Sequence, residues 1–179
     1  SVVEELLKRV RERLEDVDRV LRTWLEEVER LAEEVKRLDR ELEKDVKRIL
    51  DTIEELKRQG RVREEDIKRI LTEAEKRSRE HEKRVRDLLE RLKREDDRVN
   101  EELKRLLEEL KDELRKAKEE NNVDDKALED IKRLLEELRK RVEDVSRRVN
   151  KLLRDLEENS KRVNDELRKR VETLVERVR

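Results

Sequence analysis

The sequence has no cysteine, proline, methionine, phenylalanine or tyrosine, one glycine (Gly60) and one tryptophan (Trp24). Without cysteine there is no disulfide framework and no thiolate chemistry, and nothing indicates a redox compartment. The single histidine, His81, cannot by itself supply an imidazole-rich metal site. There is also no glycine-rich phosphate loop and no serine with a nucleophile's surroundings. We therefore expect no enzyme activity, no cofactor and no metal.

Neither sign of charge is in excess, because 52 basic residues face 53 acidic ones and the net charge is −1. A protein that binds nucleic acid electrostatically needs a basic excess to release counterions, so this balance argues against one. The longest apolar run is two residues, which excludes a transmembrane helix and the core of a signal peptide. We expect a soluble protein, cytoplasmic on expression, that binds neither nucleic acid nor membranes.

Charged residues make up 59% of the chain and apolar residues 32%. So polar a composition is typical of disorder, but the apolar residues are periodic and the residue types are strong helix formers. The apolar residues recur every eighteen positions, or about five turns at 3.6 residues per turn. They therefore line one face of a helix that needs no supercoil. Rows of this kind are Val2, Val20, Leu38 and Leu56; Leu6, Trp24 and Leu42; Val17, Val35 and Ile53; and Ile131, Val149 and Leu167.

Two interruptions of this pattern divide the chain into three helices of similar length. We expect helices at about residues 2–59, 64–120 and 125–179, joined by loops at about 60–63 and 121–124. Short loops between long helices make consecutive helices antiparallel neighbours. The sequence therefore predicts an all-α fold, a long antiparallel up-down-up three-helix bundle over residues 1–179. The bundle is expected to be a single domain, nearly untwisted, with an 18-residue core repeat.

The two loops carry matching signals for the end of one helix and the start of the next. Gly60 follows the last apolar turn of the first helix, where a left-handed residue is favoured. Val62 then lies five positions before Ile67, the spacing of a hydrophobic staple. The second loop repeats the arrangement with Asn121 and Asn122 as the stop, Val123 as the staple residue and Asp124 as the N-cap.

Polar residues interrupt the apolar rows, and the interruptions fall level with one another when the chain is folded at its loops. Residues of the first two helices are level when their numbers add up to about 123, and those of the last two at about 244. A first group then contains Asp39, Ser78, His81, Ser160 and Asn164, with Glu43 adjacent. A second group contains Thr23, Asp96, Asn100 and Ser146, and a third level holds Thr52, Thr72 and Thr173, which flank the rows.

We interpret the first two groups as hydrogen-bonded polar layers that cross the bundle, with His81 at the centre of the larger one. A buried polar group costs several kcal/mol unless it is paired, so such residues belong together. The expected gain is register and partner specificity rather than stability. The alternative is that these residues lie at the boundary of the core and reach solvent. Trp24 lies in an apolar row, so it is expected in or near the core.

The whole chain resembles de novo designed helical bundles, particularly straight, parametrically generated three-helix bundles and those with buried hydrogen-bond networks. The resemblance rests on the eighteen-residue Leu/Val/Ile repeat, the Arg/Lys/Glu/Asp surfaces, the idealised loops at Gly60 and Asn121-Asn122, and the single Trp24. Natural three-helix proteins such as spectrin repeats spread their composition over Gln, Ala, Ser, Met and aromatic residues. The resemblance implies a thermostable synthetic scaffold without a ligand.

Two functional interpretations remain open. The first is a designed, monomeric structural scaffold with no natural biological activity, which requires no partner. The second is a designed helix-helix interaction module, such as a homo-oligomer subunit, a heterodimer half or a switch cage. Such a module would use an exposed apolar face for self-association or for a designed helical partner. Apolar doublets widen the stripe of the first helix and suit either case: Leu6-Leu7, Val20-Leu21, Trp24-Leu25 and Ile49-Leu50. The sequence leaves the handedness of the bundle open.

Overall fold

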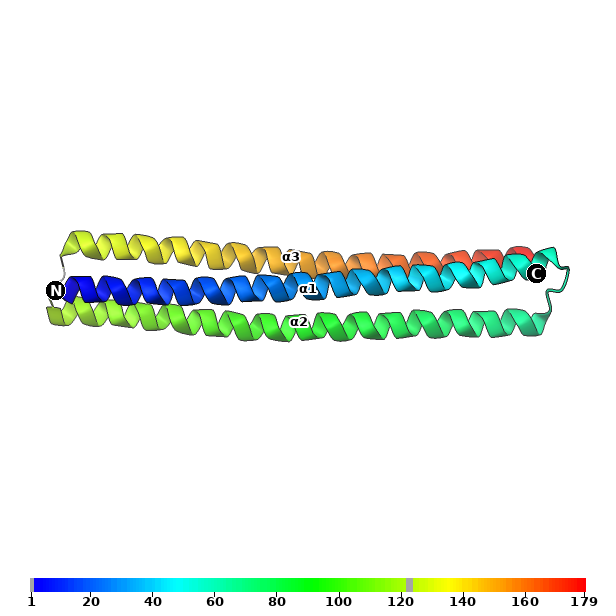
Figure 1. Ribbon diagram of the computed structural model, residues 1–179, viewed down its shortest axis with the longest axis horizontal. Helices are drawn as coiled ribbons and strands as arrows, with labels where there is room; N and C mark the ends of the chain where they lie inside the picture. The colour runs from blue at the N-terminus through cyan, green and yellow to red at the C-terminus, as the bar shows by residue number, and fades with distance from the viewer. Residues whose placement is uncertain (1, 122–123) are drawn as a thin grey trace. The chain divides into compact units, whose positions relative to one another are not determined.

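The computed structural model describes residues 2–121 and 124–179, leaving aside the side chains of residues 2, 3 and 121. Three helices, labelled in Figure 1, make up nearly all of this part: α1 (Val2–Arg58), α2 (Glu64–Asn121) and α3 (Asp125–Val178). No strand occurs among these residues, and the predicted all-α three-helix fold is confirmed. The predicted stop residue Asn122 and staple residue Val123 lie outside the described residues.

The chain divides into two compact units, each with one segment of every helix. Unit 1 comprises Ser1–Glu29 and Leu92–Lys151, and unit 2 comprises Arg30–Arg91 and Leu152–Arg179. Each unit is a three-helix packing with its own core. The single domain over residues 1–179 and the absence of supercoiling stay predictions.

Contacts between helices agree with an antiparallel arrangement of consecutive helices within each unit. In unit 1, Arg13 of α1 pairs with Glu109 of α2 at 3.1 Å. In unit 2, Glu64 near the start of α2 pairs with Arg179 at the end of the chain at 2.6 Å. These pairs agree with the alignment expected from folding the chain at its loops.

The core of unit 1 is formed by apolar residues from all three helices. Val10 of α1, Leu110 of α2 and Ile131 of α3 are at most 1% exposed. They belong to one cluster of buried residues: Leu6, Val10, Leu110, Leu114, Ala117, Leu128 and Ile131. Each helix therefore packs against the other two in this unit.

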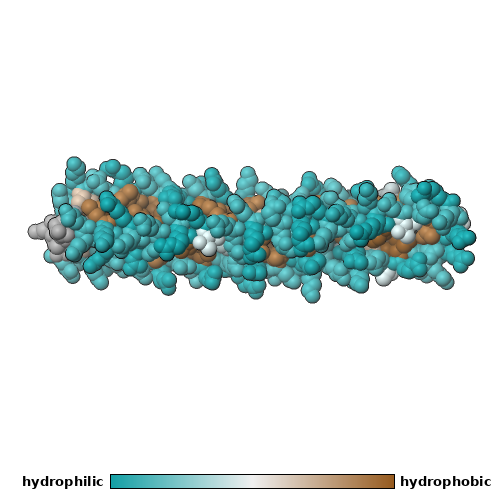
Figure 2. Space-filling view, viewed as in Figure 1, coloured by the Kyte–Doolittle hydropathy of each residue, from teal (hydrophilic) through white to brown (hydrophobic). Residues whose placement is uncertain are grey.

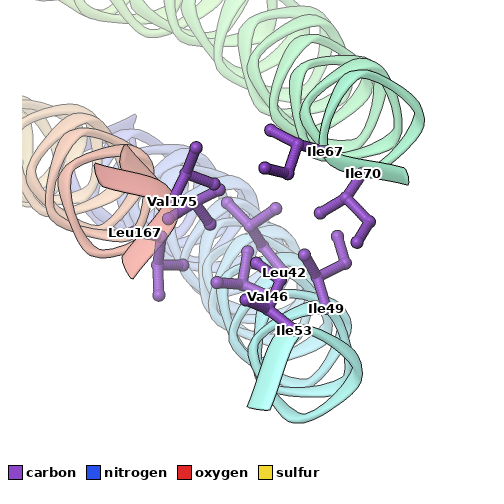
Figure 3. Packing of buried hydrophobic residues seen from close by; sticks show 9 residues of the cluster. Leu42, Val46, Ile49, Ile53, Ile67, Ile70, Leu167 and Val175 are labelled. Atoms are coloured by element: carbon purple, nitrogen blue, oxygen red, sulfur yellow. The ribbon is translucent and has the colours of Figure 1, made fainter. Parts of the chain in front are cut away.

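Unit 2 has a corresponding core, shown from close by in Figure 3. There α1 contributes Leu42, Val46, Ile49 and Ile53, whose side chains face those of α2 and α3. The remaining buried members come from the other two helices: Ile67, Ile70, Leu167, Val171 and Val175. The β-branched residues hold few rotamers, which favours one defined packing over a fluid core.

The eighteen-residue rows correspond to the buried faces of the helices. Val17, Val35 and Ile53 are all buried on α1, and so are Ile131, Val149 and Leu167 on α3. Trp24 is buried as well, so its predicted core position is confirmed. The face seen in Figure 2 is covered mainly by hydrophilic side chains, with apolar ones visible in the gaps between them.

Helix α1 ends in a Schellman motif centred on Gly60. The φ angle of Gly60 is 66°, in the left-handed region predicted from the sequence. The amide of Gly60 donates to the carbonyl of Lys57, and that of Arg61 to the carbonyl of Leu56, both at 3.1 Å. These two bonds satisfy carbonyl groups that the end of the helix would otherwise leave without partners.

Replacing Gly60 by alanine is expected to lower the free energy of unfolding by about 1 kcal/mol. No heavy atom lies within 4 Å of the position that a Cβ would take, so the cost arises from the backbone conformation and not from a clash. Urea denaturation measures the loss. Gly60→Asn serves as the control and should lose less, because asparagine tolerates the left-handed region. Equal stability of Gly60→Ala and the parent chain would contradict the requirement for a positive φ.

The starts of α2 and α3 use the two capping devices expected from the sequence. Val62 packs against the unit 2 cluster that contains Ile67, as a hydrophobic staple requires. Asp124 acts as the N-cap of α3, because its Oδ1 accepts the amide of Lys126 at 3.4 Å and its carbonyl accepts the amide of Leu128. These devices fix where each helix begins and thereby which residues of the neighbouring helices lie level.

Candidate functional site: two buried polar clusters

All five residues of the first predicted polar group are buried in unit 2. Asp39 comes from α1, Ser78 and His81 from α2, and Ser160 and Asn164 from α3. None is more than 6% exposed, and Asn164 is 1% exposed. Burial of this extent removes their polar atoms from water, so each needs a partner within the protein.

Hydrogen bonds among Arg168, Ser78 and Asn164 join α3 to α2. Arg168 Nε donates to Ser78 Oγ at 2.6 Å, and Ser78 Oγ lies 2.6 Å from Asn164 Oδ1. A guanidinium has only donors, so Ser78 Oγ accepts from Arg168 and donates its own proton to Asn164 Oδ1. Asn164 Nδ2 donates to the backbone carbonyl of Ser78 at 3.0 Å. Both bonds between Ser78 and Asn164 agree on which end of the Asn164 amide is oxygen.

The imidazole of His81 continues the chain of hydrogen bonds toward α1. Asn164 Nδ2 lies 3.1 Å from His81 Nδ1, and His81 Nε2 lies 2.7 Å from Asp39 Oδ1. Because the Asn164 amide nitrogen can only donate, Nδ1 accepts through its lone pair. The ring proton therefore resides on Nε2 and is donated to Asp39. The network selects the neutral Nε2–H tautomer of His81.

The carboxylate of Asp39 receives the last bonds of the network. Ser160 Oγ donates to it, at 2.9 Å from Oδ1 and 3.1 Å from Oδ2. Asn159 Nδ2 lies 3.5 Å from Oδ2. The hydrogen bonds thus run in one direction from an obligate donor, Arg168, to an obligate acceptor, Asp39. We call these residues the Asp39 network: Asp39, Ser78, His81, Asn159, Ser160, Asn164 and Arg168.

The second predicted group lies in unit 1, and the structure assembles it only in part. Asp96 is 7% exposed, and Asn100 donates to its Oδ2 over a long 3.4 Å. Ser146 is half-buried and Thr23 is exposed. Within the described residues, no hydrogen bond joins either of them to Asp96. The Oδ1 atom of Asp96 is buried without a partner.

Trp24 is the partner of Asp96 that sequence reasoning missed. Its indole N–H donates a hydrogen bond to the carboxyl group of Asp96. Burial raises the pKa of Asp96 and is the largest influence on it; the negative charge of Asp97 raises it further, while the bonds from Trp24 and Asn100 lower it. The sequence does carry a signal for this contact, since Trp24 and Asp96 fall nearly level in the expected alignment and an indole N–H needs an acceptor.

The third predicted level does not form a layer. Thr52, Thr72 and Thr173 are exposed, as is Glu43 beside the first group. The hydroxyls of Thr52 and Thr72 donate to carbonyls of their own helices four residues earlier, at 2.9 and 2.8 Å. Threonine on an exposed helix face commonly satisfies its hydroxyl in this way.

The Asp39 network contains serine, histidine and aspartate, but not in the arrangement of a hydrolase. A nucleophilic serine needs the histidine as its base, with the aspartate on the other ring nitrogen. Here Ser160 donates to Asp39 instead, and the second nitrogen of His81 is covered by Asn164. Both ring nitrogens of His81 are thus engaged by Asp39 and Asn164, so the imidazole is not placed as the base of either serine.

Among the described residues, no three His, Cys, Asp or Glu side chains are grouped so as to hold a metal ion. Clefts adjoin both clusters: one of about 480 Å³ is lined in part by Asn159, and one of about 380 Å³ in part by Thr23 and Trp24. A cleft of about 50 Å³ adjoins the network, lined among others by Ala74, Ser78, Asn164 and Arg168. It has room for about one or two water molecules.

None of the helices, over the part of the chain that is described, is long and apolar enough to cross a membrane.

Comparison with known proteins identifies the fold. No protein-family model matches the chain, and the search of curated proteins finds no match. Among solved structures, a protein described as a "Computationally designed three helix bundle" is similar, with 23% sequence identity and a TM-score of 0.62. The similarity covers 99% of this chain and 88% of that one. The chain therefore has the fold of a three-helix bundle, similar to that of a computationally designed protein.

Proposed function

We propose that the chain is a de novo designed structural scaffold. In this proposal it is a monomer whose core carries hydrogen-bonded polar layers, and it has no natural biological activity and no enzyme activity. The observation that supports this most is the one-directional set of hydrogen bonds from Arg168 to Asp39. Donors and acceptors match along its length, which leaves no reactive group aimed at a substrate.

The role of the Asp39 network in such a scaffold is to fix how the helices align. A shift of α3 by one turn would move Ser160 and Asn164 about 5 Å along the bundle and away from their partners. Buried donors and acceptors would then be left unpaired, at a cost of about 1–3 kcal/mol each. Apolar side chains tolerate such shifts far better, so the network supplies specificity that the Leu/Val/Ile core does not.

A second candidate function is a helix-helix interaction module, and one feature of unit 1 favours it. Leu134 of α3 is a large apolar residue that is 37% exposed. Val142 and Val145, about two to three turns further along the same helix, are only half-buried. A further helix seated on this part of α3 would cover them. The two candidates differ in whether this surface is covered in solution.

The mass in solution distinguishes the two candidates. Size-exclusion chromatography with light scattering is expected to give the monomer mass of 22.1 kDa across a wide range of protein concentration. Leu134→Glu is expected to leave this mass unchanged. A mass at least twice as large, restored to 22.1 kDa by Leu134→Glu, would contradict the monomeric scaffold and favour the interaction module.

A further inference from the structure

The carboxyl group of Asp96 differs from that of Asp39 in how well its oxygens are satisfied. Both residues are buried, but both oxygens of Asp39 lie near donors. In Asp96 the buried Oδ1 has no partner, and Oδ2 lies a long 3.4 Å from Asn100 Nδ2. An ionised carboxylate in such a position keeps a charge that the protein solvates poorly.

Burial and the negative charge of Asp97 favour the neutral form of Asp96, and they outweigh the hydrogen-bond donors that favour its ionised form. From α1 it meets the indole N–H of Trp24, and from α2 it meets Asn100 and the negative charge of Asp97. From α3 the residue expected at this level is Ser146, which is half-buried and carries no charge. The charge that acts on Asp96 is therefore of its own sign. The pKa of Asp96 is accordingly raised, chiefly by burial.

We propose that Asp96 and Trp24 form a proton-sensing pair inside unit 1. Asp96 takes up a proton from solvent as the pH is lowered, while the helices stay folded, and the indole of Trp24 reports this step in its emission. The chemical change is limited to one carboxylate that becomes a carboxylic acid. The tryptophan is the only aromatic residue of the chain apart from the imidazole of His81, which does not fluoresce, so no other side chain contributes to the signal.

The optical signal follows from where the charge lies relative to the indole. Excitation moves electron density from the pyrrole ring toward the benzene ring, which leaves the nitrogen end more positive. A carboxylate at the indole N–H stabilises this excited state and shifts emission to longer wavelength. Neutralising Asp96 removes that stabilisation, so acidification is expected to shift the emission to shorter wavelength.

The same proton has a defined effect on stability. The folded-state pKa of Asp96 is raised, so the folded chain binds this proton more tightly than the unfolded chain does. The contribution of Asp96 to the free energy of unfolding is therefore most favourable below the pKa that Asp96 has in the unfolded chain. It is lost as the pH rises through the pKa that Asp96 has in the folded chain. Above the folded-state pKa the buried charge destabilises unit 1. Asp96→Asn, which removes the charge and keeps the shape, is expected to be more stable than the parent chain there.

The experiment follows Trp24 emission as a function of pH in the parent chain, Asp96→Asn and Asp97→Asn, with helicity monitored by circular dichroism. The parent chain should show a shift to shorter wavelength at constant helicity, with a midpoint above the ordinary range of an aspartate. Asp96→Asn should show no such step. Asp97→Asn, an exposed position that leaves the pair intact, should move the midpoint to lower pH because it removes the neighbouring negative charge.

Urea denaturation of the parent chain and Asp96→Asn supplies a second readout. The stability advantage of Asp96→Asn above the emission midpoint should shrink as the pH falls through that midpoint. Three outcomes would overturn the proposal: emission that does not change with pH, a step that persists in Asp96→Asn, and a step that coincides with loss of helicity.

Discussion

Replacing His81 by leucine is expected to lower the free energy of unfolding by about 2–4 kcal/mol, although leucine is more hydrophobic than histidine. His81 is 5% exposed and occupies the centre of the Asp39 network. The substitution removes the donor to Asp39 Oδ1 and the acceptor for Asn164 Nδ2. The carboxylate and the amide then stay buried with fewer partners, and this cost exceeds the gain from the apolar side chain. Urea denaturation measures the loss.

A second variant separates the loss of hydrogen bonds from any effect of size or packing. When the five buried members are replaced together, no buried polar side chain of the network is left unpaired, and the cost should disappear. The variant combines Asp39→Leu, Ser78→Ala, His81→Leu, Ser160→Ala and Asn164→Leu. We expect its free energy of unfolding to equal or exceed that of the parent chain. Without the network the helix register is less strictly fixed. The oligomeric state, measured by sedimentation, should therefore become less uniform.

The alternative for these residues is a boundary position with access to solvent. In that case His81→Leu would change the free energy of unfolding by only a few tenths of a kcal/mol, as is usual for surface substitutions away from buried polar features. Such a small change would contradict the role of the Asp39 network in fixing the register. It would leave the three-helix fold itself unaffected.

The fold was predictable because it depends on periodicity, which a sequence displays directly. Val17, Val35 and Ile53 lie eighteen positions apart, and all three are buried on one face of α1. Gly60 adopts the positive φ that its place after the last apolar turn predicts. Helical geometry converts such spacings into faces without any knowledge of partners.

The depth of a residue within its face was harder to predict than the face itself. Ser146 shares the core phase of α3, yet it is only half-buried, as are the nearby Val142 and Val145. Thr23 lies level with Asp96 but is exposed, while its neighbour Trp24 makes the contact. Burial depends on how closely neighbouring helices approach at each level, and the period of one helix carries no information on that distance.

Five members of the Asp39 network were grouped from the sequence, but Asn159 and Arg168 were not. Asn159 and Arg168 lie beside the core rows, and their long side chains reach inward to Asp39 and Ser78. Long polar side chains at the edge of a core can bury their stems and present a polar end to it. The direction of the hydrogen bonds, and with it the tautomer of His81, required the positions of these end groups.

Leu110→Ala is expected to lower the free energy of unfolding by about 3–5 kcal/mol. Leu110 is 0% exposed and belongs to the unit 1 cluster with Val10 and Ile131. Truncation removes its buried methyl groups and leaves a cavity that three packed helices cannot readily close. Urea denaturation at fixed pH and salt measures the change.

Leu134→Ala is the matched control, because it makes the same chemical change in the same unit at a position that is 37% exposed. Its loss should stay below about 1 kcal/mol, since much of the removed surface was already near water. If the two variants lost equal stability, the cluster of buried apolar residues would not be the main source of stability of unit 1. The surface ion pairs could not fill that role, because exposed pairs such as Arg139 with Glu143 contribute little and are screened by salt. A difference between Leu110→Ala and Leu134→Ala that is unchanged by added salt would therefore assign the stability of unit 1 to its buried leucine, valine and isoleucine side chains.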